Sequence, residues 1–180
     1  MMDPSFLTHA LSTLKLASQH SMPSDLPATV WWLAPVALFF LGLTAVVDAF
    51  TGRIPDWLIF CGVVIITGVQ GFSVDWPFAG EQLRWGIACG VGLWVINIAW
   101  ERVFHHDAFG LGDAKWTILA VACFGFMPGV FAWGIGACLG IGWLAGLRLL
   151  TKKDAARVYF GPFLFVGLVI GLYWLKLRAL

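Results

Sequence analysis

Two aspartates stand where an acidic side chain is costly. Asp48 is the only charged residue between Val30 and Phe50, and Asp113 closely precedes an uncharged stretch, residues 116–147. Ionisable residues within membrane-spanning stretches are expensive and usually functional. Two close carboxyls cannot both ionise easily, so one keeps a proton while the other is charged. Such a pair suits peptide-bond hydrolysis, because the ionised acid takes a proton from water and the protonated acid gives one to the substrate, with no covalent intermediate.

Each aspartate also has a simpler interpretation as a residue at a helix end. Asp113 stands at an expected helix start, where an acidic side chain can cap free backbone N–H groups and where the helix dipole favours negative charge. For either acid alone this interpretation carries at least half the weight. The two together are more informative, provided that the elements around them bring them to the same place.

The composition indicates that those elements lie in a membrane. Of the 180 residues, 60% are hydrophobic and 12% are charged, and the mean hydropathy is +0.86. A soluble domain has roughly twice that charged fraction. The net charge of +1 gives no reason to expect a nucleic-acid partner, and the four cysteines form no CxxC pair that would indicate a zinc ribbon. We therefore expect an all-α, polytopic bundle in a lipid bilayer, with neither metal nor cofactor.

Apolar runs predict about six transmembrane helices. The first has 21 residues and covers about 31 Å, close to the hydrocarbon thickness of a bilayer. A polar connection with Pro77 and Gly80 separates the second helix from the third, and "GFMPGV" (125–130) is expected to break an overlong run into two short helices. The expected spans are Val30–Phe50, Trp57–Val74, Trp85–Phe104, two helices within Lys115–Leu150, and Tyr159–Leu175.

Glycines four residues apart recur in the third, fifth and sixth expected helices. Small residues at this spacing let helix backbones approach closely, so the pattern predicts tight packing and says nothing about function. The pairs are Gly86/Gly90, Gly136/Gly140, Gly142/Gly146 and Gly167/Gly171.

Residues 1–29 are expected to be an N-terminal arm that precedes a membrane domain of residues 30–180. The arm lacks a basic start followed by an apolar core, so it does not resemble a cleaved signal peptide. Its apolar residues at helical spacing fit a short interfacial helix, and a mobile tail fits equally well.

Basic residues predict which end of the bundle faces the cytoplasm. The connections after the first, third and fifth spans have more Lys and Arg than the opposite side, so we expect them to be cytoplasmic and both termini to lie on the other side. Asp48 then ends a helix that reaches the cytoplasmic face, and Asp113 begins one that leaves it. The two acids are therefore expected at one depth. The basic residues are Arg53, Arg102, Lys115, Arg148, Lys152, Lys153 and Arg157, against Lys15, Arg84, Lys176 and Arg178.

Three motifs resemble those of the GxGD membrane aspartyl proteases. "GLGD" at Gly110–Asp113, followed by Ala114 and Lys115, resembles the GxGDxK signature. "DAFTGRIPDWL" resembles the type IV prepilin peptidase pattern of an aspartate followed seven positions later by proline and then Asn or Asp, with matches at Asp48, Pro55 and Asp56. "FGPFLFVG", Phe160–Gly167, is similar to a late block of that family. The PAL block of the presenilin and signal-peptide-peptidase branch is absent from the sequence.

The resemblance implies that Asp48 and Asp113 are the catalytic pair of an aspartic endopeptidase of the cytoplasmic (inner) membrane. Its substrate would be a type IV prepilin or pseudopilin, whose short basic leader is cut after a glycine just cytoplasmic to the hydrophobic helix. Many full-length bacterial members have an additional CxxC-containing region and N-methylate the new terminus. This sequence lacks that region and resembles the short forms of tight-adherence pili and archaeal preflagellins, so no N-methyltransferase activity is expected. Trp116 stands where the family usually has Leu.

The same motifs supply further candidate site residues. The glycines before Asp113 are expected to leave room for a substrate backbone and to allow unusual dihedral angles. Lys115 is either a cytoplasmic anchor or a cation that favours the ionised form of Asp113. Asp56 could cap the second helix, and Pro162 is expected near the first position of the last helix, in a block that serves packing. The full set is Gly110, Gly112, Lys115, Pro55, Asp56, Gly161 and Pro162.

Three further interpretations were weighed against these expectations. His105, His106 and Asp107 are adjacent in one loop and do not supply the convergent ligands of a zinc site. A small transporter or proton-coupled channel could use Asp48 and Asp113 as a relay, but its acids should lie near mid-bilayer or on both sides. A structural protein of a secretion system would not need two acids at matched depth. The particular substrate and the oligomeric state stay open.

Overall fold

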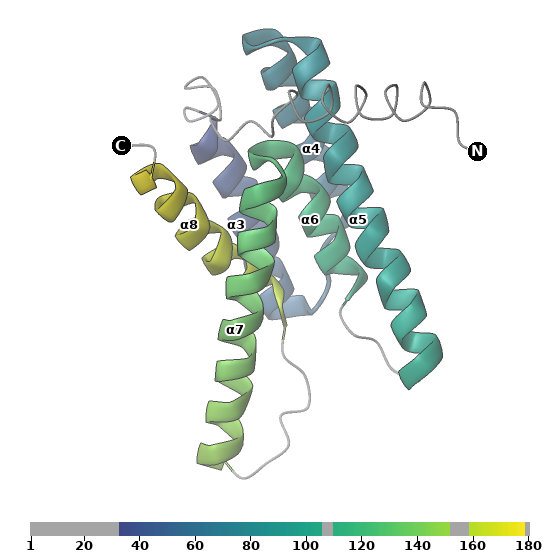
Figure 1. The fold of residues 1–180 in the computed structure, drawn as a ribbon, viewed down its shortest axis with the longest axis vertical. Helices are drawn as coiled ribbons and strands as arrows, with labels where there is room; N and C mark the ends of the chain where they lie inside the picture. The colour runs from purple at the N-terminus through teal and green to yellow at the C-terminus, as the bar shows by residue number, and fades with distance from the viewer. Residues whose placement is uncertain (1–32, 106–109, 152–158, 179–180) are drawn as a thin grey trace, which may run out of the picture.

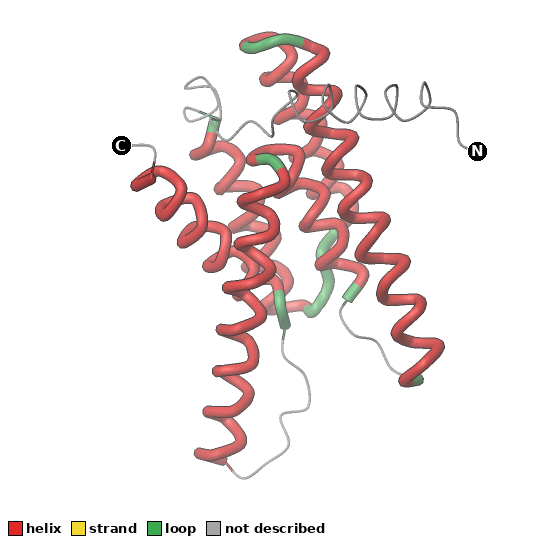
Figure 2. Tube along the Cα trace, in the orientation of Figure 1, coloured by secondary structure: helices red, strands yellow, loops and turns green. Residues whose placement is uncertain are grey.

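The computed structural model describes residues 33–105, 110–151 and 159–178. Within these ranges all regular structure is helical, in six helices that run alternately up and down (Figures 1 and 2). The expected all-α fold is confirmed, whereas the N-terminal arm lies outside the described residues. In order, the helices are α3 (Ala34–Thr51), α4 (Asp56–Ser73), α5 (Trp76–Phe104), α6 (Leu111–Phe124), α7 (Phe126–Thr151) and α8 (Gly161–Arg178).

Four of the helices, α3, α4, α5 and α7, are long and apolar enough to cross a membrane. Helix α8 is a shorter apolar helix, and α6 has only 14 residues. At 1.5 Å per residue α6 is about 21 Å long, less than the roughly 30 Å of a hydrocarbon core. The chain is therefore a multi-pass membrane protein in which α6 does not reach across the bilayer by itself.

Helix α5 begins nine residues before the expected start. The stretch with Pro77 and Gly80 was predicted to be a polar connection, yet it forms the first turns of a 29-residue helix. The Asp75 side chain caps this helix by accepting a hydrogen bond from the Phe78 N–H at 2.6 Å. Pro77 stands in the first turn, where its missing N–H has no intrahelical partner in any case. The prediction was wrong because a proline that starts a helix was taken as one that interrupts it.

The expected break in "GFMPGV" is confirmed and lies at Gly125. This residue has φ 83°, a backbone conformation that favours glycine, and its N–H donates to Val121 O at 2.8 Å. Pro128 belongs to the first turn of α7 and does not interrupt it. Of the two helices predicted to be short, α6 is short, whereas α7 has 26 residues.

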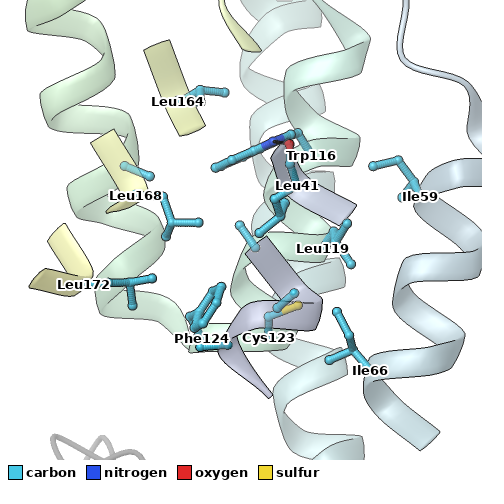
Figure 3. Close-up of a cluster of buried hydrophobic side chains, with 14 of the residues drawn as sticks. Leu41, Ile59, Ile66, Trp116, Leu119, Cys123, Phe124, Leu164, Leu168 and Leu172 are labelled. Atoms are coloured by element: carbon cyan, nitrogen blue, oxygen red, sulfur yellow. Dashed lines mark hydrogen bonds between the residues drawn. The ribbon is translucent and has the colours of Figure 1, made fainter. Parts of the chain in front are cut away.

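Helix α6 is the central helix of the bundle and contacts the other five. Its side chains lie between leucines of α8 and isoleucines of α4 (Figure 3). Trp116 is fully buried, and its indole N–H points to Leu41 O of α3 at 3.4 Å. From Trp116 to Phe124 the helix is almost entirely buried, which explains why this part of α6 has no polar residue except Thr117.

The C-terminal end of α6 depends on a side chain of α4. The last carbonyls of a helix have no intrahelical donor, and a membrane interior has no water to supply one. Gln70 is fully buried, and its amide donates to Ala122 O at 3.2 Å and to Cys123 O at 3.3 Å. A polar residue of α4 thus permits α6 to end inside the bundle.

Most of the paired glycines lie where helices touch. A Cβ at Gly86 would lie 2.6 Å from Ile118 O of α6, and one at Gly167 would lie 2.5 Å from Ala132 O of α7. Gly142 and Gly146 differ, because a Cβ at either would meet nothing within 4 Å. Three of the four predicted pairs therefore serve packing within the described chain, and the fourth does not.

Candidate active site

A pocket of about 710 Å³ lies where α3 ends and α6 begins, beside α7 and the segment before α8. Asp48 and Asp113 both line it, and they are only 8% and 6% exposed. The fold therefore brings into one pocket two acids that are 65 positions apart in sequence and that were expected only to lie at one depth.

Asp48 lies in the last turn of α3 and receives a hydrogen bond from the beginning of α8. Its Oδ2 accepts from the Gly161 N–H at 3.1 Å, and its backbone carbonyl accepts from the Gly52 N–H at 2.7 Å. Gly52 ends α3 in the left-handed region, with φ 65°. A turn that favours glycine therefore follows the acid and directs the chain towards α4.

Asp113 is the third residue of α6 and serves the helix start as well as the pocket. Its Oδ2 accepts from the Gly110 N–H at 3.0 Å, and Gly110 is the N-cap residue. An acidic side chain that reaches back to the N-cap N–H is one half of a capping box. The helix-end interpretation is thus correct for Asp113, although the residue stands at the third helical position.

Each acid keeps one carboxyl oxygen out of these bonds. Oδ2 of Asp48 and Oδ2 of Asp113 accept the bonds just described, whereas Oδ1 of each accepts none from the residues that the structure describes. Within the same ranges no hydrogen bond joins the two carboxyls directly. The two bonded oxygens therefore fix the orientation of the acids in the pocket.

A chain of hydrogen bonds links the Asp113 turn to α7. The Thr117 hydroxyl donates to Asp113 O at 2.7 Å, and the Trp133 indole N–H donates to the Thr117 hydroxyl at 2.8 Å. The Trp133 ring packs on Phe160 with a centroid separation of 5.3 Å. The first turn of α6 is thereby fixed to α7 and to the residue that precedes α8.

Gly110 and Gly112 both line the pocket, but they do not have unusual dihedral angles. Gly110 has φ −74° and ψ 150°, which any residue adopts, and Gly112 is an ordinary helical residue. That part of the prediction was wrong. A Cβ at Gly112 would lie 3.3 Å from Ile54, so glycine suits this position because it has no side chain to crowd Ile54.

Lys115 forms an ion pair with Asp56 of α4 rather than with Asp113. The pair joins the first turns of α4 and α6, and Asp56 is 78% exposed there. Pro55 is the N-cap of α4 and Asp56 is its first residue, without a capping hydrogen bond from its side chain, so the predicted cap is wrong. The negative charge still suits the positive end of the helix dipole.

Gly161 and Pro162 are the first two residues of α8, so proline stands near the expected position. The bond from Gly161 to Asp48 was not foreseen, because the block was expected to serve packing alone. The sequence signal that could have indicated this contact is Gly161 itself, which stands directly before Pro162 in an otherwise bulky apolar block. His105 ends α5 with φ 58°, whereas His106 and Asp107 lie outside the described residues.

One wall of the pocket is an apolar stripe along α7. Its members recur every three or four residues, the spacing of one helix face. The lining also includes the two acids and the glycines before Asp113, so the pocket combines carboxyl groups with an apolar surface. The stripe consists of Trp133, Ala137, Gly140, Ile141 and Leu144.

Comparison with known proteins gives one match. The family model of the type IV leader peptidase family matches residues 35–145, more than half of the chain. This range includes both aspartates and ends before α8. Neither the search of curated proteins nor the search of solved structures found a match. Two buried acids in one pocket of a multi-pass helical bundle fit that match, and the chain belongs to the type IV leader peptidase family.

Proposed function

We propose that this protein is a membrane aspartic endopeptidase that removes the short basic leader of type IV prepilins or prepilin-like proteins. Asp48 and Asp113 are its catalytic residues. The observation that carries this proposal is that both acids line one pocket, each with one carboxyl oxygen held by a backbone N–H. Membership of the leader peptidase family supports the reaction class and the kind of substrate.

The two acids activate one water. The ionised carboxyl takes a proton from the water, whose oxygen attacks the carbonyl carbon of the scissile bond, while the protonated carboxyl donates to the carbonyl oxygen. Collapse of the tetrahedral intermediate breaks the C–N bond. The carboxyl that took the proton from water gives it to the leaving amine, and a hydroxyl of the intermediate returns a proton to the other carboxyl. Burial favours this division of roles, because two close carboxylates with little water around them cannot both stay charged.

The site lies at the end of the bundle that we assign to the cytoplasm. The exposed residues Arg53 and Arg102 lie at that end, together with Lys115. A prepilin with its apolar helix in the bilayer would present its leader at this side, and the apolar stripe of α7 suits the residues next to the scissile bond. This orientation puts both termini on the non-cytoplasmic side of the inner membrane.

Co-expression with candidate prepilins tests the proposal. The parent protein is expected to shorten a prepilin, seen as a mobility shift, whereas Asp48→Asn and Asp113→Asn leave it uncut. The matched control is Asp75→Asn, which changes an acid at the N-cap of α5 where Asn caps equally well. Processing by either site variant at the parent rate would remove that acid from the mechanism.

A further inference from the structure

We propose that Gly161 is a positioning residue that holds Asp48 in its catalytic orientation. The proposal rests on the proposed function, in which Asp48 is one of the two catalytic acids. Gly161 is not among the residues that line the pocket, and it has no reactive side chain. It acts through its backbone, from a helix that the family match does not include.

Contact geometry at Gly161 requires the absence of a side chain. The buried N–H of Gly161 lies 3.1 Å from Oδ2 of Asp48. A Cβ at Gly161 would lie 2.7 Å from the same oxygen and 3.2 Å from the Cβ and Cγ of Asp48. Since real Cβ atoms do not approach other atoms to 2.7 Å, any larger residue must push the carboxyl aside. The same position thus both donates to the acid and leaves it space.

The dipoles of α3 and α8 have opposite effects on the Asp48 carboxylate. Asp48 lies in the last turn of α3, where the helix dipole is negative and disfavours a carboxylate. Gly161 is the first residue of α8, where free N–H groups and the positive end of the dipole favour one. The positive start of α8 therefore offsets the unfavourable effect of the α3 dipole on the Asp48 carboxylate, at its Oδ2 atom.

The two residues before Gly161 connect the same segment to the supports of both acids. A Cβ at Gly52 would overlap the ring of Tyr159, so this ring packs directly on the turn that follows Asp48. Phe160 packs on Trp133, which is hydrogen-bonded to the Thr117 hydroxyl above the Asp113 turn. Residues 159–161 thereby set the position of α3 relative to α6.

The test compares two glycines of α8 and one of α7 that differ in what an added Cβ would meet. Gly161→Ala is expected to lower kcat at least about tenfold with KM within about twofold, because displacement of a reacting group by about 1 Å can cost about 100-fold. Gly167→Ala is the matched control, since its Cβ would meet the backbone of α7 and neither acid is among its nearest atoms. It is expected to lower thermal stability in detergent, with kcat of the folded protein within about threefold of the parent. Gly142→Ala, where a Cβ meets nothing, should change neither quantity.

Asp48→Asn, assayed in parallel, separates the two proposals. Cleavage by Asp48→Asn at the parent rate would overturn the proposed function itself. An inactive Asp48→Asn together with parent kcat in Gly161→Ala would overturn the positioning role alone. An equal loss of kcat in Gly161→Ala and Gly167→Ala would also overturn it, because the effect would then follow from α7–α8 packing.

A second variant keeps the inference testable if Gly161→Ala does not fold. Tyr159→Ala removes the ring that packs on Gly52 and adds no atom near Asp48. We expect it to lower kcat more than fivefold with little change in KM. Its control is Ile141→Ala, which lines the same pocket from α7 and should change KM more than kcat. Parent kcat in Tyr159→Ala would contradict the proposed link between this segment and Asp48.

Discussion

At the scale of single residues, each acid has a structural role as well as a proposed chemical one. Asp113 caps the start of α6 with one oxygen, and Asp48 binds the start of α8 with one oxygen. A substitution that removes the acid therefore disturbs a helix end too. Asn is the suitable replacement for both, because its carbonyl oxygen can still accept from the same N–H.

The Trp133–Thr117 bond makes a prediction at this scale. Trp133→Phe keeps a ring against Phe160 but removes the N–H that holds the Thr117 hydroxyl. Loss of one hydrogen bond is expected to destabilise the protein by about 1 kcal/mol. We expect kcat to fall about three- to tenfold, since the Asp113 turn loses a support. Steady-state cleavage and thermal unfolding measure both effects.

Trp143→Phe is the control for that measurement, because Trp143 lies on the same helix and is 55% exposed. It should leave kcat and stability close to the parent. Equal kinetics in the two variants would show that the hydrogen bond from α7 does not support the Asp113 turn.

At the scale of elements, the sequence predicted that the six helices exist better than it predicted where each helix begins and ends. Hydrophobic runs predicted six helices, and the glycine-containing "GFMPGV" predicted the break after α6. The start of α5 was missed because Pro77 was taken as a breaker, although Asp75 and a first-turn proline together begin a helix. The pairing of the acids was predictable from alternating helix direction. The Gly161–Asp48 bond was not, because a contact between residues 113 positions apart has no local signal.

Gln70 provides a prediction for the end of α6. Gln70→Ala leaves the carbonyls of Ala122 and Cys123 without their donor in a buried site, which is expected to cost about 1–3 kcal/mol. The midpoint of thermal unfolding in detergent should fall. Phe60→Ala on the same helix removes an exposed side chain and is expected to have little effect. Unchanged stability in Gln70→Ala would mean that α6 does not need this cap.

At the scale of the whole molecule, the prediction concerns membrane orientation. Single cysteines at Arg102 and Glu81, in a background without the four native cysteines, lie towards opposite ends of α5 and are both exposed. The excess of basic residues at the Arg102 end predicts that an impermeant maleimide added to intact cells labels the Glu81→Cys variant alone. Labelling of Arg102→Cys alone would invert the orientation and put the acids on the wrong side for a leader peptidase.

The pocket wall gives a second prediction at this scale. Ala137→Phe adds a ring to the apolar stripe that lines the pocket, whereas Val130→Phe adds a ring on an exposed face of the same helix. The first change is expected to raise KM for prepilin several-fold, and the second should leave KM near the parent value. Equal KM values in a steady-state cleavage assay would mean that substrate does not contact this wall.

The central claim is that Asp48 and Asp113 act as one unit on one water, and the rates of single and double variants test it most directly. Purified parent protein, Asp48→Asn, Asp113→Asn and the double variant would be assayed for prepilin cleavage in lipid nanodiscs. Each single change is expected to lower kcat at least about 100-fold. The double variant should be within about threefold of the slower single variant, because residues that act as a unit are strongly non-additive. Parent kcat in either single variant, or losses that multiply in the double variant, would contradict the claim.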